Sequence, residues 1–288
     1  MTVEKSSPCK VNLLLNILGR RADGFHELET VFHPVNFCDR LTFTRAGRQL
    51  QLSCSEPSLP VDSSNLVHRA AVKFLEVAKI SDGVRIHLEK RIPLAAGLGG
   101  GSGNAAVTLL GLNELFGSPL ALPQLHELAA ALGSDVNFFL QSKPALATGR
   151  GEKIEALADF PAMCGVRILL IHPGFGISTP WSYQALADYP EALNGRPGRA
   201  RKLVSLLQTA PLAEAAAEFY NALEAPALDK YPILALYQEF LLANGAVAAL
   251  MSGSGSTTFA LFPAGTPVEA AAEKFKGRFG KTCWTAIA

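Results

Sequence analysis

The feature that most constrains the fold is a run of five glycines within seven positions, GLGGGSG at 97–103, placed between two segments of regular periodicity. The preceding segment, 84–89, predicts a strand, and the following segment, 104–116, predicts a helix. Glycine lets main-chain N–H groups converge because no Cβ atom blocks the approach. A helix N-terminus adds unpaired N–H donors and a partial positive charge. The stretch 97–104 therefore predicts an anion site, most often one for phosphate.

Other kinds of glycine-rich loop explain this stretch less well. A flexible linker does not need a helix directly after it, and a tight turn needs fewer glycines. The Walker pattern is absent, because no lysine follows the glycines. Gly101, Gly103 and Ala106 match part of a dinucleotide-binding fingerprint, but no clear acidic residue follows about 20 positions later. A nicotinamide-dependent dehydrogenase is therefore a weaker alternative.

Composition narrows the class of protein. A chain of 288 residues, 49% of them hydrophobic, can bury a large core and can form more than one domain. The net charge of +1 gives no global field that would attract nucleic acid or an anionic membrane. No signal-like N-terminal segment and no apolar run of about 18 residues is present, so we expect no membrane span. Five cysteines without a CxxC pair, and histidines without ligand spacing, favour a cytoplasmic protein without disulfides or bound zinc.

Periodicity predicts an α+β chain of two domains. Strands are predicted at about 9–18, 41–53, 84–89, 166–173, 246–252 and 256–262. Helices are predicted at about 65–79, 104–116, 121–132, 201–208, 211–223, 232–243 and 267–276. The segment 187–200, with its prolines and glycines, predicts a surface loop. The charged segment 150–163 is the best candidate for a junction, so we expect domains of residues 1–155 and 156–288.

A lysine stands among apolar residues in the first predicted strand. In CKVNLLLNI, Lys10, Asn12 and Asn16 share one face with a leucine. A lysine in such surroundings needs an anionic partner or water. An edge strand with a solvated face and a strand with a functional face both account for the pattern.

An aspartate follows the predicted helix at 121–132. Gly133 predicts the end of that helix, and Ser134 or Asp135 then predicts the N-cap of the next one. The same carboxylate can also serve as a partner for Lys10. Both roles of Asp135 stay open on the residues alone.

Five segments carry a resemblance to a known family. PLAAGLGGGSGNAA (93–106) resembles the second motif of the GHMP kinases, a superfamily of small-molecule kinases. The segments at 7–35, 132–140, 172–183 and 250–262 resemble those of one branch, whose members phosphorylate 4-diphosphocytidyl-2-C-methyl-D-erythritol in the non-mevalonate isoprenoid pathway. The chain departs from the pattern where Phe25 replaces the usual tyrosine and Gly103 the usual serine. The loss of a hydroxyl at Gly103 puts the role of that position in doubt.

The resemblance implies a fold and a reaction. The fold would be the two-domain GHMP kinase fold, with an N-terminal ribosomal-protein-S5-like domain and a C-terminal ferredoxin-like α/β sandwich. ATP with Mg²⁺ would phosphorylate the C2 hydroxyl of the methylerythritol unit, giving the 2-phosphate and ADP. The partner would be this cytidine diphosphate-linked small molecule, with no nucleic acid or membrane partner, and the chain would be a monomer or weak homodimer.

The resemblance also implies roles for particular residues. Lys10 and Asp135 would be catalytic, with Lys10 keeping the Asp135 carboxylate ionised. The nucleotide would be bound by Asn65, Lys90, Pro93, Leu94, Ala95, Ala96, Gly97, Leu98, Gly99, Gly100, Gly101, Ser102, Gly103 and Asn104. The acceptor substrate would be bound by Asn12, Phe25, His26, Asp135, Thr179 and Tyr183. No protein-held metal is implied.

Several of these residues have ordinary structural alternatives. Phe25 could be a core residue, His26 a turn histidine, Asn65 a plain helix N-cap and Thr179 a helix cap before Pro180. The second glycine-serine loop, SGSGSTT at 252–258, could be a hairpin turn, and the resemblance implies that it packs over the phosphate end of the site. A homoserine or mevalonate type of GHMP kinase, or a non-catalytic ligand-binding protein on the same fold, is the competing function. The segment RRADGFHELETVF argues against the former, and the presence of Lys10 and Asp135 against the latter.

Overall fold

The computed structural model describes residues 2–141 and 143–288. Helices and strands are interspersed along the chain, which confirms the predicted α+β class. The chain divides into two compact units: unit 1 comprises Met1–Cys9, Cys38–Ile92 and Gly99–Ser142, and unit 2 comprises Lys10–Phe37, Pro93–Leu98 and Lys143–Ala288. The long strands β1 (Thr2–Arg20) and β2 (His26–Arg45) contribute residues to both units. The domain boundary after residue 155 stays a prediction.

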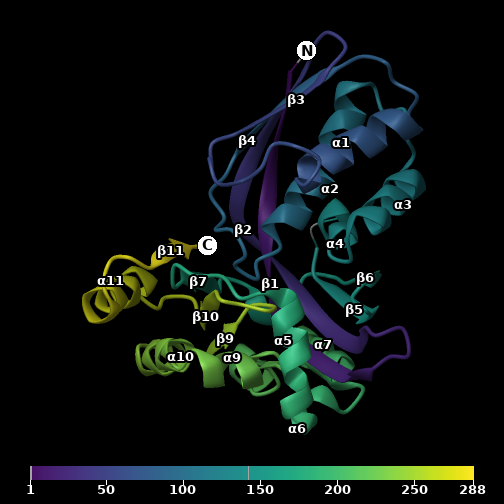
Figure 1. Cartoon of the computed structure of the whole chain (residues 1–288). Helices are drawn as coiled ribbons and strands as arrows, with labels where there is room; N and C mark the ends of the chain where they lie inside the picture. Colours follow the sequence, from purple (N-terminus) through teal and green to yellow (C-terminus); the bar gives the residue numbers. More distant parts are fainter. Residues whose placement is uncertain (1, 142) are drawn as a thin grey trace. The chain divides into compact units, whose positions relative to one another are not determined.

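Unit 1 combines strands with four helices (Figure 1). The second half of β2 pairs antiparallel with β4 (Val84–Glu89), which pairs parallel with β3 (Leu50–Cys54). The helices are α1 (Leu66–Val77), α2 (Gly100–Leu115), α3 (Leu122–Leu132) and α4 (Val136–Gln141). Helix α2 packs against the other three and is buried on most of its surface. It passes so close to β2 that a Cβ atom at Gly111 would overlap the ring of Phe43, so glycine is required at that crossing.

Most of the elements predicted for unit 1 are confirmed, and two predictions are corrected. The single strand predicted at 41–53 is instead two strands, because Gly47, at a φ of +44°, lets the chain turn between β2 and β3. The loop predicted at 97–104 is shorter than expected. Helix α2 begins at Gly100, with Gly99 as N-cap at a φ of +70°, so residues 100–104 belong to the helix. Gly133 is the C-cap of α3, as predicted.

The last part of unit 2 contains an antiparallel sheet of four strands in the order β11-β7-β10-β9. The strands are β7 (Arg167–His172), β9 (Ala248–Met251), β10 (Thr258–Phe262) and β11 (Trp284–Ile287), and only β11 was not predicted. Helix α10 (Ile233–Ala243) packs against β9 and β10, and α11 (Val268–Phe279) packs against β7 and β11 (Figure 1). The aromatic rings of Tyr237, Phe240, Phe275 and Phe279 contact one another between α10 and α11. The burial of Tyr237 and Phe275 contributes to the apolar stabilisation of this part of unit 2.

Unit 2 also contains a second group of strands. The first half of β2 pairs antiparallel with β5 (Ala145–Gly149), and β5 pairs with β6 (Lys153–Ala156). Strand β1 pairs parallel with the short β8 (Tyr220–Asn221). The remaining helices of unit 2 are η1 (Pro161–Met163), α5 (Thr179–Ala185), η2 (Leu186–Asp188), α6 (Pro190–Leu193), α7 (Arg199–Thr209), α8 (Leu212–Ala216) and α9 (Glu224–Lys230).

Two predictions in unit 2 are wrong. The helix predicted at 211–223 ends with α8 at Ala216, because Tyr220 and Asn221 form a strand against Leu14 and Leu15 of β1. The alanine-rich sequence favours a helix locally, and the long-range strand pairing overrides that preference. The loop predicted at 187–200 contains the short helix α6 and ends where Gly198 begins α7. Over residues 2–141 and 143–288, no helix is long and apolar enough to cross a membrane.

Candidate active site

The glycine-rich stretch divides between the two units after Leu98. Its backbone enters the left-handed region at Ala95, Gly97 and Gly99, whose φ angles are +50°, +75° and +70°. Glycine adopts this region without strain, whereas an alanine there, such as Ala95, is uncommon. A Cβ atom at Gly97 would also overlap the main-chain oxygen of Ser252. Gly97 is therefore required both by its conformation and by the close approach of a second loop.

The first turn of α2 has the properties of an anion site within unit 1. The helix is 16 residues long, no side chain caps its N-terminus, and no acidic residue lies in its first turn. Gly101 is exposed and Ser102 is half-buried, so main-chain donors at this end can be reached. A Cβ atom at Gly103 would lie 2.9 Å from the oxygen of Pro8 and 3.0 Å from the hydroxyl of Ser7. The local packing thus accounts for glycine at position 103.

Lys90 lies beside the same helix end. Its Nζ donates to Asp39 Oδ2 at 2.6 Å and to the oxygen of Ile92 at 2.6 Å, and both charged side chains are almost fully buried. The other oxygen of Asp39 accepts from the main-chain nitrogens of Arg91 and Ile92. A Cβ atom at Gly100 would lie 3.3 Å from Lys90 Nζ. Lys90 is therefore a buried cation at the start of α2, and its contact with a nucleotide stays a prediction.

Asn65 and Asp135 also belong to unit 1. Asn65 is the N-cap of α1, since its Oδ1 accepts from the nitrogen of Val67 at 2.9 Å. Its ordinary capping role is confirmed, and a role near the adenine stays a prediction. Asp135 is half-buried and lies between the end of α3 and the start of α4.

Lys10 and Asn12 face the same side of β1 in unit 2, as predicted. Lys10 Nζ donates to Asn12 Oδ1 at 2.6 Å, and Asn12 Nδ2 donates to Thr30 Oγ1 at 2.8 Å. Lys10 is 4% exposed and Asn12 is 2% exposed, so the alternative of a solvated strand face is wrong. The Lys10 ammonium also lies 5.2 Å from the ring centre of Phe32. Lys10 is a member of unit 2 and Asp135 of unit 1, and the pairing of their charges stays a prediction.

The main chain of β1 is joined to the glycine-rich stretch within unit 2. The nitrogen of Lys10 donates to the oxygen of Leu98 at 3.0 Å. A buried lysine is thereby fixed next to the chain segment that leads into the predicted phosphate site.

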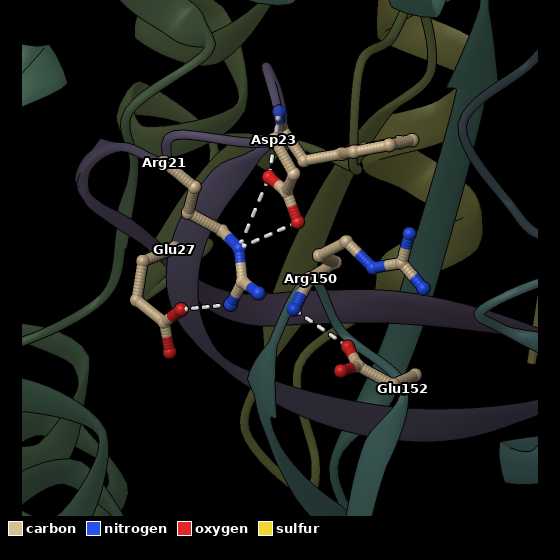
Figure 2. A network of polar contacts seen from close by, with 6 residues as sticks. Arg21, Asp23, Glu27, Arg150 and Glu152 are labelled. Atoms are coloured by element: carbon tan, nitrogen blue, oxygen red, sulfur yellow. Dashed lines mark hydrogen bonds and ion pairs between the residues drawn. The ribbon is translucent and has the colours of Figure 1, made fainter.

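A turn in unit 2 gathers the charged residues Arg21, Asp23 and Glu27 (Figure 2). Arg21 contacts the carboxylate of Asp23 through Nε and donates from Nη1 to Glu27 Oε2 at 2.5 Å. Asp23 Oδ1 in turn accepts from the nitrogen of Phe25 at 3.1 Å. The Phe25 ring is 54% exposed, so its interpretation as a core residue is wrong. The guanidinium of Arg150 lies 4.6 Å from the centre of that ring.

His26 and Tyr183 are brought together from β2 and α5. Their ring centres lie 5.1 Å apart, with the planes tilted by 33°. Burial, assisted by the positive charge of Arg20, lowers the pKa of His26. The imidazole is therefore neutral at pH 7, where one ring nitrogen can donate a hydrogen bond and the other can accept one.

Thr179 connects α5 with the second glycine-serine loop. Ser178 caps α5 and Thr179 is its first residue, so the predicted capping role of Thr179 is wrong. Thr179 Oγ1 instead lies 2.8 Å from Ser254 Oγ, a hydrogen-bond distance. Strands β9 and β10 pair antiparallel, which confirms that 252–257 connects a hairpin. Ser252 Oγ donates to the main-chain oxygen of Gly97 at 2.9 Å, and the main-chain nitrogen of Thr257 donates to the main-chain oxygen of Ala96 at 3.2 Å.

Outside the recognised segments, sequence reasoning missed three residues of unit 2 that contact predicted site residues or their loops. Arg150 lies over Phe25, Asn221 binds the second glycine-serine loop, and Glu224 binds the strand that leads into that loop. None lies in a recognised segment. The one available signal was a polar residue, Asn221, inside an alanine-rich stretch.

Comparison with known proteins identifies two matching domains. The GHMP kinases N terminal domain matches residues 65–143, and the GHMP kinases C terminal domain matches residues 200–281. Among curated proteins, 4-diphosphocytidyl-2-C-methyl-D-erythritol kinase of Synechococcus sp. (strain JA-2-3B'a(2-13)) is 41% identical over 88% of this chain and 83% of its own length. The protein of the same name from Syntrophotalea carbinolica is 38% identical over 98% of this chain and 96% of its own length.

Solved structures give the same result for the fold. A crystal structure of 4-(cytidine 5'-diphospho)-2C-methyl-D-erythritol kinase is 35% identical, covers 99% of this chain and 98% of its own, and has a TM-score of 0.78. A homoserine kinase from Cytophaga hutchinsonii, at 18% identity and a TM-score of 0.71, shares the fold. The predicted two-domain GHMP kinase fold is therefore confirmed.

Proposed function

Because the chain belongs to the 4-diphosphocytidyl-2-C-methyl-D-erythritol kinase family of GHMP kinases, we propose that it phosphorylates the C2 hydroxyl of 4-diphosphocytidyl-2-C-methyl-D-erythritol. The γ-phosphoryl group of ATP passes to that oxygen, and the products are the 2-phosphate and ADP. The observation that carries the proposal is the 38% identity over 98% of the chain to a curated enzyme of this name. Membership of the family makes the chain a small-molecule kinase that uses ATP.

The predicted anion site suits the phosphates of ATP. The first turn of α2 offers main-chain donors and the positive end of a long helix. Lys90 lies beside Gly100, with its ammonium paired to the buried carboxylate of Asp39. We assign Asn65, Lys90 and residues 93–104 to the nucleotide on this basis. Positioning and charge neutralisation supply most of the catalysis in a phosphoryl transfer.

Lys10 and Asp135 carry the transfer itself in this proposal. Asp135 orients the acceptor hydroxyl and accepts its proton as the oxygen attacks phosphorus. Lys10 stabilises the negative charge that develops on the transferring group. Asn12 holds the Lys10 ammonium by a 2.6 Å hydrogen bond. A buried, hydrogen-bonded cation keeps its position without reorganisation during the reaction, which strengthens its effect.

The acceptor substrate binds to residues of unit 2 in this proposal. Phe25 offers an exposed aromatic face to the cytosine ring, and Tyr183 offers a second one beside His26. Neutral His26 hydrogen-bonds the cytosine edge, for which its lowered pKa is suited. Thr179 and Asn12 complete the predicted set.

In this proposal Mg²⁺ binds together with ATP. Mg²⁺ in kinases is usually bound by substrate phosphates, waters and one or two carboxylates. Within the described residues, no group of three or more histidine, cysteine, aspartate or glutamate side chains could hold a metal ion. The half-buried carboxylate of Asp135 and the hydroxyl of Ser102 are the oxygen ligands that would hold a Mg²⁺ carried by ATP. When bound, the ion would neutralise charge on the phosphates.

We also propose the kind of partner, the oligomeric state and the location of the protein. The partner is a small molecule, with no nucleic acid or membrane partner, and the chain is a monomer or a weak homodimer. A cytoplasmic location is supported by the five cysteines, none of which forms a disulfide.

An acceptor panel tests the function. Purified protein with MgATP is offered 4-diphosphocytidyl-2-C-methyl-D-erythritol, homoserine or mevalonate, and ADP release is followed. We expect ADP release with the cytidylyl substrate to exceed that with either alternative by at least about 100-fold in kcat/KM. A higher rate with homoserine or mevalonate would overturn the proposed acceptor.

A further inference from the structure

The loop 252–257 lies against two parts of the proposed site that belong to unit 2. The Ser252 hydroxyl donates to the main-chain oxygen of Gly97, and the Thr257 nitrogen donates to the main-chain oxygen of Ala96. Gly253, at a φ of +56°, approaches Lys10 so closely that a Cβ atom there would lie 3.3 Å from Nζ and 3.4 Å from Asn12 Oδ1. The position of this loop therefore bears on both the glycine-rich stretch and the buried lysine.

The side chain of Asn221 binds the loop 252–257 through the main-chain oxygen of Gly253. Its amide nitrogen donates to the oxygen of Met251 at 2.7 Å and to that of Gly253 at 2.8 Å. Its amide oxygen accepts from the nitrogen of Leu223 at 3.0 Å. Asn221 is 1% exposed, and its backbone pairs with β1 at Leu15. The side chain thus joins β1, the strand of Lys10 and Asn12, to the carbonyl of Gly253.

Glu224 holds the strand that leads into the loop. Its Oε1 accepts from the nitrogen of Met251 at 2.6 Å and from Gln238 Nε2 at 2.6 Å. Asn221 and Glu224 together bind both the N–H and the C=O of Met251, the last residue of β9. Asn221 is buried and Glu224 is half-buried, and side-chain hydrogen bonds in such surroundings stabilise the main chain that they bind. Such a clamp on one residue and its second neighbour fixes where a loop leaves its strand.

We propose that Asn221 and Glu224 are positioning residues that hold the loop 252–257 against Lys10 and the 96–98 segment of the glycine-rich stretch. The inference rests on the proposed function, because it gives the loop a part in that site. Neither residue needs to contact ATP or the acceptor. They act through Gly253 and Ser252, whose neighbours Lys10 and Gly97 are proposed to face the transferring phosphate.

Kinetics distinguish positioning from a purely structural role. We expect Asn221→Ala to lower kcat by about 10- to 100-fold, because small misplacements of catalytic groups slow transfer by such factors. The KM values for ATP and the acceptor should change by less than about threefold, since few binding contacts are lost. A kcat within twofold of wild type in a folded variant overturns the proposal.

Asn113→Ala is the matched control. Asn113 in α2 likewise binds main-chain atoms through both its amide nitrogen and its amide oxygen, in two hydrogen bonds to Leu120 at 3.0 Å each, where Asn221 makes three. It lies 13 residues beyond Gly100, roughly 20 Å along the helix. This variant should lose similar stability and keep its kcat within twofold. An equal fall in kcat for both variants overturns the positioning role.

If Asn221→Ala does not fold, two substitutions at Glu224 test the positioning role instead. Glu224→Ala removes the acceptor for the Met251 nitrogen, and we expect kcat to fall by about tenfold. Glu224→Gln keeps a carbonyl oxygen of the same reach, and it should retain kcat within threefold. Equal activities in the two variants, whether both high or both low, overturn the proposal.

Hydrogen exchange tests the clamp without reference to the activity. The nitrogens of Ser252, Gly255 and Thr257 are all hydrogen-bonded, so their amides should be protected in the wild type. Asn221→Ala should speed exchange over 252–257 by at least about tenfold and leave the strand 84–89 unchanged. Unchanged protection of 252–257 overturns the clamp. If the wild type shows no turnover, the proposed function fails, and the exchange result still decides the clamp.

Discussion

The ammonium of Lys10 donates a 2.6 Å hydrogen bond to Asn12 Oδ1, and both side chains are almost completely buried in unit 2. Asn12 is fixed in turn by its bond to Thr30, whose hydroxyl donates to the oxygen of Leu14. The lysine therefore sits at the end of a chain of hydrogen bonds that starts on its own strand. A buried cation held in this way is preorganised, which is the property that makes it effective in catalysis.

Removing the acceptor of that bond should weaken catalysis more than binding. In Asn12→Ala, Lys10 loses a hydrogen-bond partner that helps to orient it, and we expect kcat to fall by about 10- to 100-fold. Steady-state kinetics with saturating MgATP measure the effect. Asn244→Ala removes a hydrogen bond to Phe240 at the end of α10 and serves as the control. Equal kcat values for Asn12→Ala and the control would show that the Lys10–Asn12 bond has no catalytic importance.

The assignment of Asp135 predicts a separation of binding from turnover. Asp135→Asn keeps the size of the side chain and removes its basicity, so we expect kcat to fall by at least about 1,000-fold. The Kd for ATP, from calorimetric titration, should stay within about threefold of wild type. Wild-type rates in this variant would remove Asp135 from the mechanism.

Phe25 should determine affinity for the acceptor and leave that for ATP unchanged. Phe25→Ala removes a stacking surface worth about 1–3 kcal/mol per base, so KM for the cytidylyl substrate should rise by about 5- to 160-fold. Leu122→Ala, which truncates an apolar side chain 56% exposed at the start of α3, is the control and should change neither KM. Equal increases for both substrates in Phe25→Ala would contradict a specific role.

Alanine substitutions at Gly97 and Gly117 distinguish the effect of backbone strain from that of steric overlap. Their φ angles are +75° and +83°, but a Cβ atom at Gly97 would overlap Ser252, whereas nothing lies within 4 Å of one at Gly117. Gly117→Ala should cost about 1–2 kcal/mol of stability and keep its activity. Gly97→Ala should add a loss of ATP affinity, because the glycine-rich stretch and the loop 252–257 must move apart. Thermal unfolding and ATP titration compare them, and equal ATP affinities would contradict this account.

The carboxyl of Glu224, a half-buried residue, should make the stability of the fold depend on pH. Burial raises its pKa to about 7 from an ordinary 4.5. The folded chain therefore holds this proton between pH 4.5 and 7 while the unfolded chain releases it, so the contribution of Glu224 to stability falls as the pH rises through that window. The full change is about 3 kcal/mol. Glu224→Gln should gain stability over wild type at pH 8 compared with pH 5, and a pH-independent difference in Tm would contradict the raised pKa.

Local patterns in the sequence predicted much of the fold. Helix α1 with its Asn65 cap, the end of α3 at Gly133 and the β9–β10 hairpin all follow from short-range periodicity and capping. The wrong prediction at 211–223 has a long-range cause. Asn221 is 32 residues from Gly253 and pairs with β1, and neither contact leaves a local signal.

The candidate site was predicted only in part, for a similar reason. Lys10 and Asn12 alternate on a strand, so their shared face could be predicted. Arg150 reaches Phe25 through the fold, and nothing near either residue indicates the other. Residues that act by holding a loop, such as Asn221 and Glu224, carry no chemistry of their own that a motif could record.

Phosphorus NMR of the purified protein with MgATP and 4-diphosphocytidyl-2-C-methyl-D-erythritol tests the central claim most directly. The proposed reaction predicts that a new phosphomonoester signal grows in step with ADP while the diphosphate signals of the cytidylyl group persist. ATP that stays intact in the presence of this acceptor, under conditions where the protein is folded, would contradict the proposed function.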